Sequence, residues 1–210
     1  MIKINNLNYG YKRSEPIIKN LTYHFQRETS YLITGHNGVG KTTLIRLILG
    51  LLKPQLGTIS VNEEAIVSYL PDFNGIYDDL TVMDNVIFRL SLYKIKFTDK
   101  EETFYALLQQ YHLVGKEKEL VRNLSLGMKK KVAFICSMII EPDIYILDEP
   151  TGGIDAESTI EVLNLMNELS EKGKLIICIS HEEIIKQGFK ATHLSLEGGV
   201  LSECINFTCS

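Results

Sequence analysis

A glycine-rich segment, GHNGVGKT at residues 35–42, ends in a lysine followed by a threonine. Because glycine has no Cβ, successive backbone N–H groups of such a segment can turn inward around phosphate oxygens. Lys41 then places a compact positive charge on the β- and γ-phosphates, and the Thr42 hydroxyl is a ligand for Mg²⁺. The segment predicts a site for a nucleoside triphosphate with Mg²⁺, against the alternative of an ordinary surface loop.

Two adjacent carboxylates are the second candidate for chemistry. Asp148 and Glu149 end the apolar run IYILDEP at residues 144–150. Acids at the end of a buried strand cost free energy unless they have partners. We therefore expect Asp148 to hold the metal or its water shell and Glu149 to polarise the attacking water. The alternative is a helix-capping acid beside a surface acid.

The phosphate segment needs a strand before it and a helix after it. SYLITG (residues 30–35) is an apolar run that ends at the segment, and TTLIRLILGLL (42–52) carries apolar residues at helical spacing. A helix that begins there directs its positive dipole end at the phosphates. The order of elements therefore agrees with the motif.

The rest of the chain alternates between strand and helix patterns. Helical spacing is expected from Thr81 to about Leu120, again after Ser125, and from residue 156, where Asp155 can cap a helix that ends near Gly173. Strands are expected at 2–9, 21–26, 30–35, 58–61, 65–70, 143–148, 174–180, 193–197 and 200–205. This alternation predicts an α/β fold with a doubly wound, mainly parallel sheet that binds ligands at the carboxyl ends of its strands. We expect one domain over residues 1–210, in which a helical subdomain at about 73–140 is inserted.

Composition limits the possible classes. The 210 residues include 22 basic and 26 acidic ones, a net charge of −4, so no global basic field indicates nucleic acid. The densest basic run, Lys129 to Lys131, is interpreted as a solvated helix face. Four cysteines without CxxC spacing are interpreted as small buried hydrophobes. No apolar run approaches the ~20 residues of a membrane span, and no signal peptide is seen, so we expect a soluble intracellular chain.

Three further features stand in register with the phosphate motifs. LSLGM (residues 124–128) precedes a helix, Asp155 follows the carboxylates, and the pair Ser180 and His181 ends the strand KLIICIS. Together, from Tyr11 to His181, this set resembles the ATP-binding-cassette (ABC) transporter ATPases. The resemblance implies a P-loop NTPase with an N-terminal antiparallel β part, which binds ATP with Mg²⁺ and hydrolyses the ATP.

The resemblance also implies roles for single residues. Tyr11 looks like the aromatic that stacks on adenine, with Tyr9 as its competitor. Glu149 looks like the general base, and His181 like the residue that contacts the γ-phosphate and positions the water. The residues that correspond to the phosphate-binding loop are Gly35, His36, Asn37, Gly38, Val39, Gly40, Lys41, Thr42 and Thr43.

In this family the LSLGM segment serves the nucleotide of a second subunit. Ser125 and the backbone of Gly127 are similar to the signature that reaches the partner's γ-phosphate, where a helix N-terminus faces the anion. Asp155 is similar to the acid of the loop that crosses the interface. The resemblance therefore implies an ATP-dependent dimer, either a homodimer or a heterodimer.

The sequence departs from the family pattern at two places. Asp72, in YLPD, stands where glutamine is usual; a carboxylate there can ligate Mg²⁺ directly but has a shorter reach. Leu126 replaces a glycine and Met128 a glutamine of the signature. With the run GIYDDLTVMDN, these departures resemble the bacitracin- and lantibiotic-type exporter ATPases.

That subgroup implies a separate transmembrane subunit as the partner and a position at the cytoplasmic face of the cell membrane, with no nucleic acid bound. Residues 72–95 are then the expected coupling surface, with Phe73, Ile76 and Tyr77 as apolar contacts. Two other classes stay open: a weakly hydrolysing regulatory half of a heterodimer, favoured by Asp72 and LSLGM, and a soluble ATPase that acts on ribosomes or DNA. The latter usually has two cassettes or a long coiled-coil insertion, neither of which the sequence contains. A GTPase or a small-molecule kinase leaves LSLGM unexplained.

Overall fold

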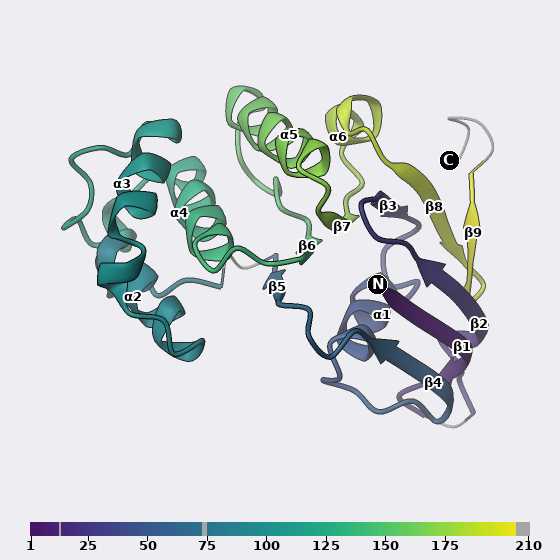
Figure 1. The fold of residues 1–210 in the computed structure, drawn as a ribbon. Helices are drawn as coiled ribbons and strands as arrows, with labels where there is room; N and C mark the ends of the chain where they lie inside the picture. The colour runs from purple at the N-terminus through teal and green to yellow at the C-terminus, as the bar shows by residue number, and fades with distance from the viewer. Residues whose placement is uncertain (13, 73–74, 205–210) are drawn as a thin grey trace.

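A six-stranded sheet forms the centre of the molecule (Figure 1). The computed structural model describes residues 1–12, 14–72 and 75–204. The strand order is β5-β6-β7-β3-β8-β9; the first five strands are parallel, and β9 runs antiparallel to β8. The strands are β5 (Val67–Leu70), β6 (Ile144–Asp148), β7 (Leu175–Ile179), β3 (Ser30–Thr34), β8 (Thr192–Glu197) and β9 (Val200–Glu203). Every residue of β3, β6 and β7 is buried, as expected for parallel strands that are covered on both faces.

Successive residues of β6 belong to two different hydrophobic clusters. Ile144 and Ile146 pack with helix α1 (Lys41–Ile48), whereas Tyr145 and Leu147 pack with α4 (Leu126–Met138) and α5 (Ala156–Glu171). Side chains alternate across a strand, so one apolar run fills both layers of the core. The continuous apolar pattern of this strand follows from that position.

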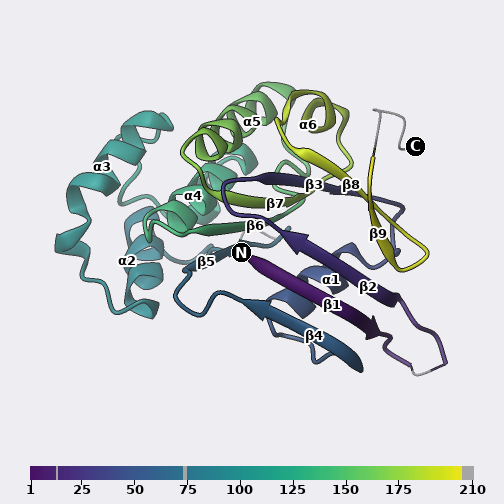
Figure 2. The ribbon, with the colours of Figure 1, turned by 45° about the vertical axis from the view of Figure 1, so that its right-hand side comes forward.

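A second, antiparallel sheet has the strand order β2-β1-β4. It consists of β1 (Ile2–Tyr9), β2 (Ile18–Phe25) and β4 (Leu56–Val61). Ile2 and Ile4 of β1 share a hydrophobic cluster with Leu44 and Ile45 of α1 and with the central sheet. Figure 2 shows α1 beside this sheet. The first helix is therefore held by both sheets, which fixes the phosphate segment at its start.

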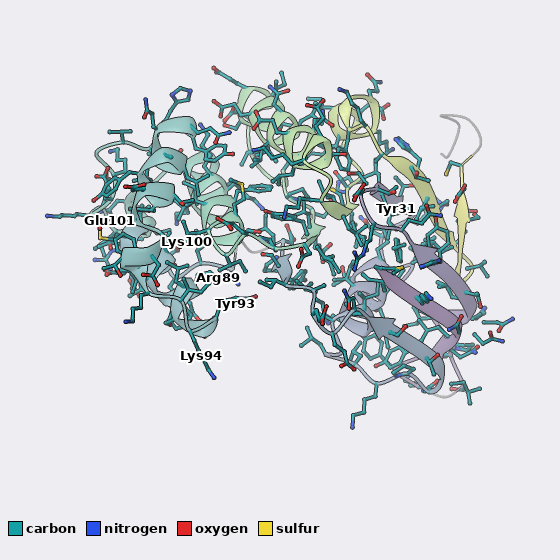
Figure 3. All side chains as sticks on the ribbon, in the orientation of Figure 1. Tyr31, Arg89, Tyr93, Lys94, Lys100 and Glu101 are labelled. Carbon is teal, nitrogen blue, oxygen red and sulfur yellow. The ribbon has the colours of Figure 1, made fainter. Side chains whose placement is uncertain are left out.

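The helices between β5 and β6 gather at one side of the molecule, at the left of Figure 1. They are α2 (Val82–Leu92), η1 (Phe97–Asp99), α3 (Glu101–Gln110), η2 (Val121–Asn123) and α4. Lys94, Lys100 and Glu101 lie on this side, and Tyr31 of β3 lies at the other (Figure 3). The buried residues of these helices join the cluster that covers β6 and β7. The proposed bounds of a helical subdomain, 73–140, stay a prediction, and its first residue, Phe73, lies outside the described residues.

Most expected elements are present, and the predicted α/β fold is confirmed. Asp155 caps α5 by accepting a hydrogen bond from Ser158 N at 2.9 Å, as expected. The short helix α6 (Glu183–Gly188) was not expected, because its six residues are too few for a helical period to be visible. Among the described residues, no helix has the length and apolar character needed to cross a membrane.

Two interpretations of the sequence are wrong in part. Lys130 is 2% exposed, so the run of three lysines is not a solvated helix face. Cys136 and Cys178 are buried free thiols, as expected, whereas Cys204 is only partly buried and is disulfide-bonded. In both cases, the residue type predicts only the average burial of such a side chain, and tertiary contacts determine the burial observed here.

Candidate nucleotide site

The carboxyl ends of four neighbouring parallel strands, β5, β6, β7 and β3, lie along one edge of the central sheet. A cavity of about 620 Å³ opens there. Eleven of the predicted site residues line it: Tyr11, Asn37, Gly38, Gly40, Lys41, Thr42, Thr43, Asp72, Asp148, Glu149 and His181. The fold therefore brings segments from both halves of the chain to one place.

The phosphate loop needs a glycine at residue 40, directly before α1. Gly40 has φ of 114°, and a Cβ on it would lie 2.5 Å from Ile17 Cγ2. It is the N-cap of α1, and no side chain caps this helix. The first N–H groups of a helix have no partner within the helix. The loop thus offers uncapped N–H donors, together with the positive end of the helix dipole, to an anion.

Lys41 folds back over the loop. Its Nζ donates to the carbonyl oxygens of Gly35 at 2.7 Å and His36 at 3.2 Å, and the side chain is buried. Gly35, His36 and Val39 do not line the cavity; the first two hold the lysine through their carbonyls. A phosphate that enters the loop can therefore exchange these carbonyl acceptors for charged oxygens, which form stronger hydrogen bonds.

Oxygen donors suited to Mg²⁺ meet beside the loop. Asp148 is buried, with the Thr42 hydroxyl nearby. Burial raises the pKa of the Asp148 carboxyl; the Thr42 hydroxyl and Lys41 oppose this rise, and the charges of Glu149 and Asp72 add to it. A hydroxyl with carboxylates that repel one another fits a hard cation.

The protein alone supplies only part of a metal shell. Within the described part of the chain, no three His, Cys, Asp or Glu side chains group closely enough to hold a metal by themselves. A Mg²⁺ ion typically keeps water molecules and takes ligands from substrate phosphates in addition to one or two carboxylates. Thr42, Asp148 and Asp72 are the residues that would hold it here.

Glu149 has one carboxylate oxygen held and one free. Its Oε1 lies 2.9 Å from His181 Nδ1, whereas Oε2 is buried and has no hydrogen-bond partner among the described residues. Buried oxygens without a partner are rare in folded proteins. Since the free oxygen belongs to a residue that lines the phosphate cavity, it can accept a proton from a water molecule bound there.

The two tyrosines near the N-terminus have different environments. Tyr9 is 9% exposed and packs in the core, whereas Tyr11 is 60% exposed and lines the cavity. The Tyr11 hydroxyl lies 3.4 Å from Thr43 Oγ1. The rings of Tyr9 and Tyr11 form an edge contact with centroids 5.5 Å apart. Of the two, Tyr11 is the one with a ring face available to a base.

Ser125, Gly127 and Asp155 do not line this cavity. Ser125 is the exposed N-cap of α4, and Asp155 is the exposed N-cap of α5. The two caps are adjacent, because a Cβ on Gly127 would lie 2.6 Å from Ser158 Oγ, which donates to Asp155 at 3.0 Å. Leu126 is exposed, whereas Met128 is partly buried and packs against the core. These residues form a second, separate surface.

Three contributors were missed in the sequence. Arg46 and Tyr69 line the cavity; burial and, to a smaller extent, the charge of Asp148 raise the pKa of Tyr69. Arg46 follows Thr42 by one helical turn, so the helical spacing was a usable signal. Tyr69 stands near the end of β5, three residues before Asp72. The third is Lys130; nothing in the local sequence indicates that it lies beside the site.

Comparison with known proteins identifies the architecture. The sequence model of the ABC transporter family matches residues 18–152. The chain belongs to the ABC transporter family. It is an ATP-binding domain of that family, which accounts for the phosphate loop, the carboxylate pair and the exposed start of α4 at Ser125.

Two relatives of this ABC ATP-binding domain come from Bacillus subtilis. It is similar to the ABC-type transporter ATP-binding protein EcsA of that organism, with 29% identity over 191 residues that cover 86% of this chain and 77% of EcsA. It is also similar to the SkfA peptide export ATP-binding protein SkfE, with 31% identity over 82% of this chain and 75% of SkfE. The structure of cbiO1 from Clostridium perfringens, part of the ABC transporter complex cbiONQ, superposes with a TM-score of 0.81 at 25% identity, over 96% of this chain and 86% of cbiO1.

Replacing Asp148 by asparagine is expected to stabilise this ABC domain in the absence of nucleotide. The folded state raises the pKa of this carboxyl above its ordinary 3.8, so the stability that the group contributes is complete below 3.8 and is lost as the pH rises through the folded pKa. At neutral pH the ionised carboxylate is therefore a cost that the neutral amide of the variant does not have. Calorimetry should show a higher Tm for Asp148→Asn at neutral pH, where about 1 kcal/mol corresponds to 2–4 °C.

Two conditions test the cause of that gain. The difference between the variant and the wild type should shrink at acidic pH, where Asp148 becomes protonated. It should reverse with Mg-ATP, because the wild type gains stability from a ligand that the variant binds poorly. A variant less stable at neutral pH without nucleotide would contradict the assignment.

Proposed function

We propose that this chain is the ATP-hydrolysing subunit of an ABC exporter and that it drives a separate membrane subunit through ATP-dependent dimerisation. The observation that carries the proposal is the state of Glu149: one carboxylate oxygen is held by His181 and the other is free and buried beside the phosphate loop. A residue that only caps a helix or faces solvent has no need for such an arrangement.

The chemical step is the attack of water on the γ-phosphate. Glu149 Oε2 accepts a proton from the water, whose oxygen bonds to the γ-phosphorus while the bond to the bridging oxygen of the β-phosphate breaks. The products are ADP and phosphate. Lys41 and the loop N–H groups hold the charge that moves onto the bridging oxygen. Thr42, Asp148 and Asp72 would hold a Mg²⁺ ion, which would further neutralise the charge of the phosphates.

A second subunit completes the site. Ser125 and the N–H groups at the start of α4 are exposed and face away from the chain's own cavity. A head-to-tail partner brings the same surface to the γ-phosphate, with a helix N-terminus aimed at the anion. Asp155, next to Gly127 through Ser158, then lies in the interface. Dimer formation is therefore coupled to ATP binding.

The coupling surface lies on the segment that follows β5. Tyr77 is 53% exposed and its ring meets Phe88 of α2 edge-on at 5.0 Å, whereas Ile76 is partly buried against the core. Phe73 lies outside the described residues. Exposed paired aromatic rings of this kind fit a partner that supplies an apolar helix. The chain itself would then sit at the cytoplasmic face of the membrane. Export is proposed from the similarity to SkfE, a peptide export protein by name.

Crosslinking tests this partner. A cysteine introduced at Tyr77 should crosslink to an integral membrane polypeptide in cells, because this side chain is exposed, whereas native Cys136 and Cys178 are buried. Leu56→Cys is a matched control, since Leu56 is also exposed but lies on β4 of the antiparallel sheet. Crosslinks to ribosomal or DNA-bound proteins, or equal crosslinking yields from the cysteines at Tyr77 and Leu56, would contradict the exporter assignment.

Turnover tests the catalytic half of the proposal. The purified chain with Mg-ATP and its membrane partner should release phosphate above background. If it binds ATP without releasing phosphate, the chain is the regulatory half of a heterodimer.

A further inference from the structure

Lys130 is a buried cation next to the nucleotide site. It is 2% exposed, and its Nζ donates to the carbonyl oxygen of Asp72 at 2.9 Å and, in a longer contact, to that of Glu149 at 3.5 Å. Lysine is almost never fully buried unless it is paired, because desolvation of the ammonium is costly. A lysine on the exposed face of a helix does not need such bonds, so the burial of Lys130 indicates a functional role.

The two acceptors belong to Asp72 and Glu149, two of the three acidic residues of the site. Asp72 follows β5, Glu149 follows β6, and Lys130 lies on α4, so a single ammonium joins three segments that are distant in sequence. The bonds go to the backbone carbonyls, which leaves both carboxylates available to face the cavity. The lysine therefore acts on these residues without competing for their side chains.

Glu149 needs such support. It has φ of 48°, in the left-handed region, a strained conformation that persists in a residue other than glycine only when neighbours hold it. Its N–H donates to Ile179 O at 2.9 Å, and its carbonyl accepts from Gly152 N at 3.1 Å as well as from Lys130. The direction of the carboxylate depends on this backbone conformation.

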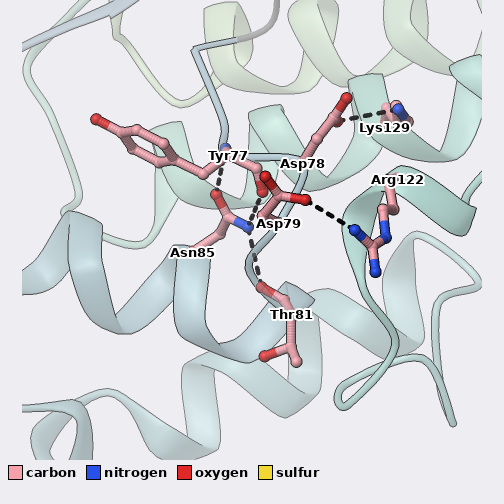
Figure 4. Close-up of polar contacts among 7 residues, drawn as sticks. All are labelled: Tyr77, Asp78, Asp79, Thr81, Asn85, Arg122 and Lys129. Carbon is pink, nitrogen blue, oxygen red and sulfur yellow. Dashed lines mark hydrogen bonds and ion pairs between the residues drawn. The ribbon is translucent and has the colours of Figure 1, made fainter.

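The same helix also holds the far end of the segment after β5. Lys129 binds Asp78 at 2.9 Å, and buried Asn85 of α2 accepts from Tyr77 N at 2.7 Å and donates to Tyr77 O and Thr81 O (Figure 4). Lys131, by contrast, pairs with Glu161 of α5 at 2.6 Å, away from the site. Two consecutive lysines of α4 thus fix Asp72 and Asp78.

We propose that Lys130 is a positioning residue for hydrolysis: through the carbonyls of Asp72 and Glu149 it sets the direction of both acidic side chains and links them to α4, the helix that begins at Ser125. This inference rests on the proposed ATPase function. A displacement of α4 when its N-terminus meets the partner's nucleotide would move the general base of the chain's own site.

The charge of Lys130 is part of the proposal. Burial lowers the pKa of Lys130, while the carboxylates of Asp72, Glu182 and Glu149, on the segments around it, oppose this change. Hydrogen bonds from an ammonium are about twice as strong as those from a neutral amine. An arginine at this position keeps a charged donor and should therefore retain most of the function.

The experiment compares three variants of the full chain with its partner: Lys130→Met, Lys130→Arg and, as a matched control, Lys131→Met. We expect Lys130→Met to lower kcat by about 10- to 100-fold, the effect of losing hydrogen bonds to a charged group, with KM for Mg-ATP changed by less than about threefold. Lys130→Arg should restore most of kcat. Lys131→Met should leave kcat unchanged.

Hydrogen exchange gives a readout that does not depend on turnover. The amides of Glu149 and Gly152, which are bonded to Ile179 O and Glu149 O, should exchange faster in Lys130→Met and return towards the wild-type rate in Lys130→Arg. If Lys130→Met does not fold, Lys130→Gln, which keeps a donor without the charge, replaces it in both measurements.

The outcomes separate this inference from the proposed function. Absence of phosphate release by the wild type would overturn the ATPase assignment, while the exchange rates would still decide whether Lys130 holds Glu149. A wild type that hydrolyses ATP no faster than Lys130→Met, or exchange rates that are equal in both, would overturn the role of Lys130. A kcat of Lys130→Arg no higher than that of Lys130→Met would contradict the role of its charged donor.

Discussion

Glu149→Gln is expected to lower ATP turnover by about 10²- to 10⁴-fold, the usual contribution of a general base, while ATP binding persists. The amide cannot accept a proton from water, and the phosphate loop and the Mg²⁺ ligands are unchanged. In the proposed mechanism, dimer formation follows ATP binding and ends with hydrolysis, so the variant should accumulate as an ATP-bound dimer. Phosphate release measures the first effect, and size-exclusion chromatography with Mg-ATP measures the second.

Glu63→Gln is the matched control, because Glu63 is exposed and does not line the cavity. It should turn over like the wild type and show no trapped dimer. If Glu149→Gln hydrolysed ATP within a few-fold of the wild type, Glu149 would not be the base. A loss of turnover without a dimer would contradict the proposed head-to-tail dimer but would agree with the assignment of Glu149 as the general base.

Lys41→Met is expected to weaken Mg-ATP binding by about 30-fold or more, equivalent to roughly 2 kcal/mol, the lower end of the cost of truncating a hydrogen-bonded charge partner. In the absence of nucleotide, the ammonium donates to the carbonyls of Gly35 and His36, so the variant also loses two bonds within the loop. Calorimetric titration with Mg-ATP gives the affinity, and the Tm without nucleotide gives the structural part.

Lys118→Met provides the comparison, because Lys118 is exposed and lies outside the cavity. Its affinity for Mg-ATP and its Tm should match those of the wild type. Should Lys41→Met bind Mg-ATP as tightly as Lys118→Met does, the glycine-rich loop would not be the phosphate site.

The features that the sequence predicted well are local ones. The phosphate loop and the cap at Asp155 depend on residues close together in the chain, so their types and spacing carry the information. The buried strands were also visible, because a strand covered on both faces has an apolar run with no alternation. The α/β fold follows from the order of such elements.

Errors arose where the environment of a residue depends on distant segments. Lys130 stands in a basic run of the kind that is usually solvated. It is buried nevertheless, because Asp72 and Glu149 approach it from the ends of β5 and β6. Tyr11 is favoured over Tyr9 by the resemblance to the family and not by its residue type, and this choice was not an error: Tyr9 turns into the core and Tyr11 lines the cavity. No local pattern contains either fact.

The sequence by itself determined that this protein has a phosphate loop, a carboxylate pair and a parallel α/β sheet, because each of these is specified by residues within a few positions of one another. Only the tertiary structure decided which oxygen of Glu149 is free, which tyrosine faces the cavity and why a lysine is buried on α4. These depend on how four strand ends converge at one sheet edge and on what α4 places beside them. Contacts between such distant segments form only when the whole core is packed.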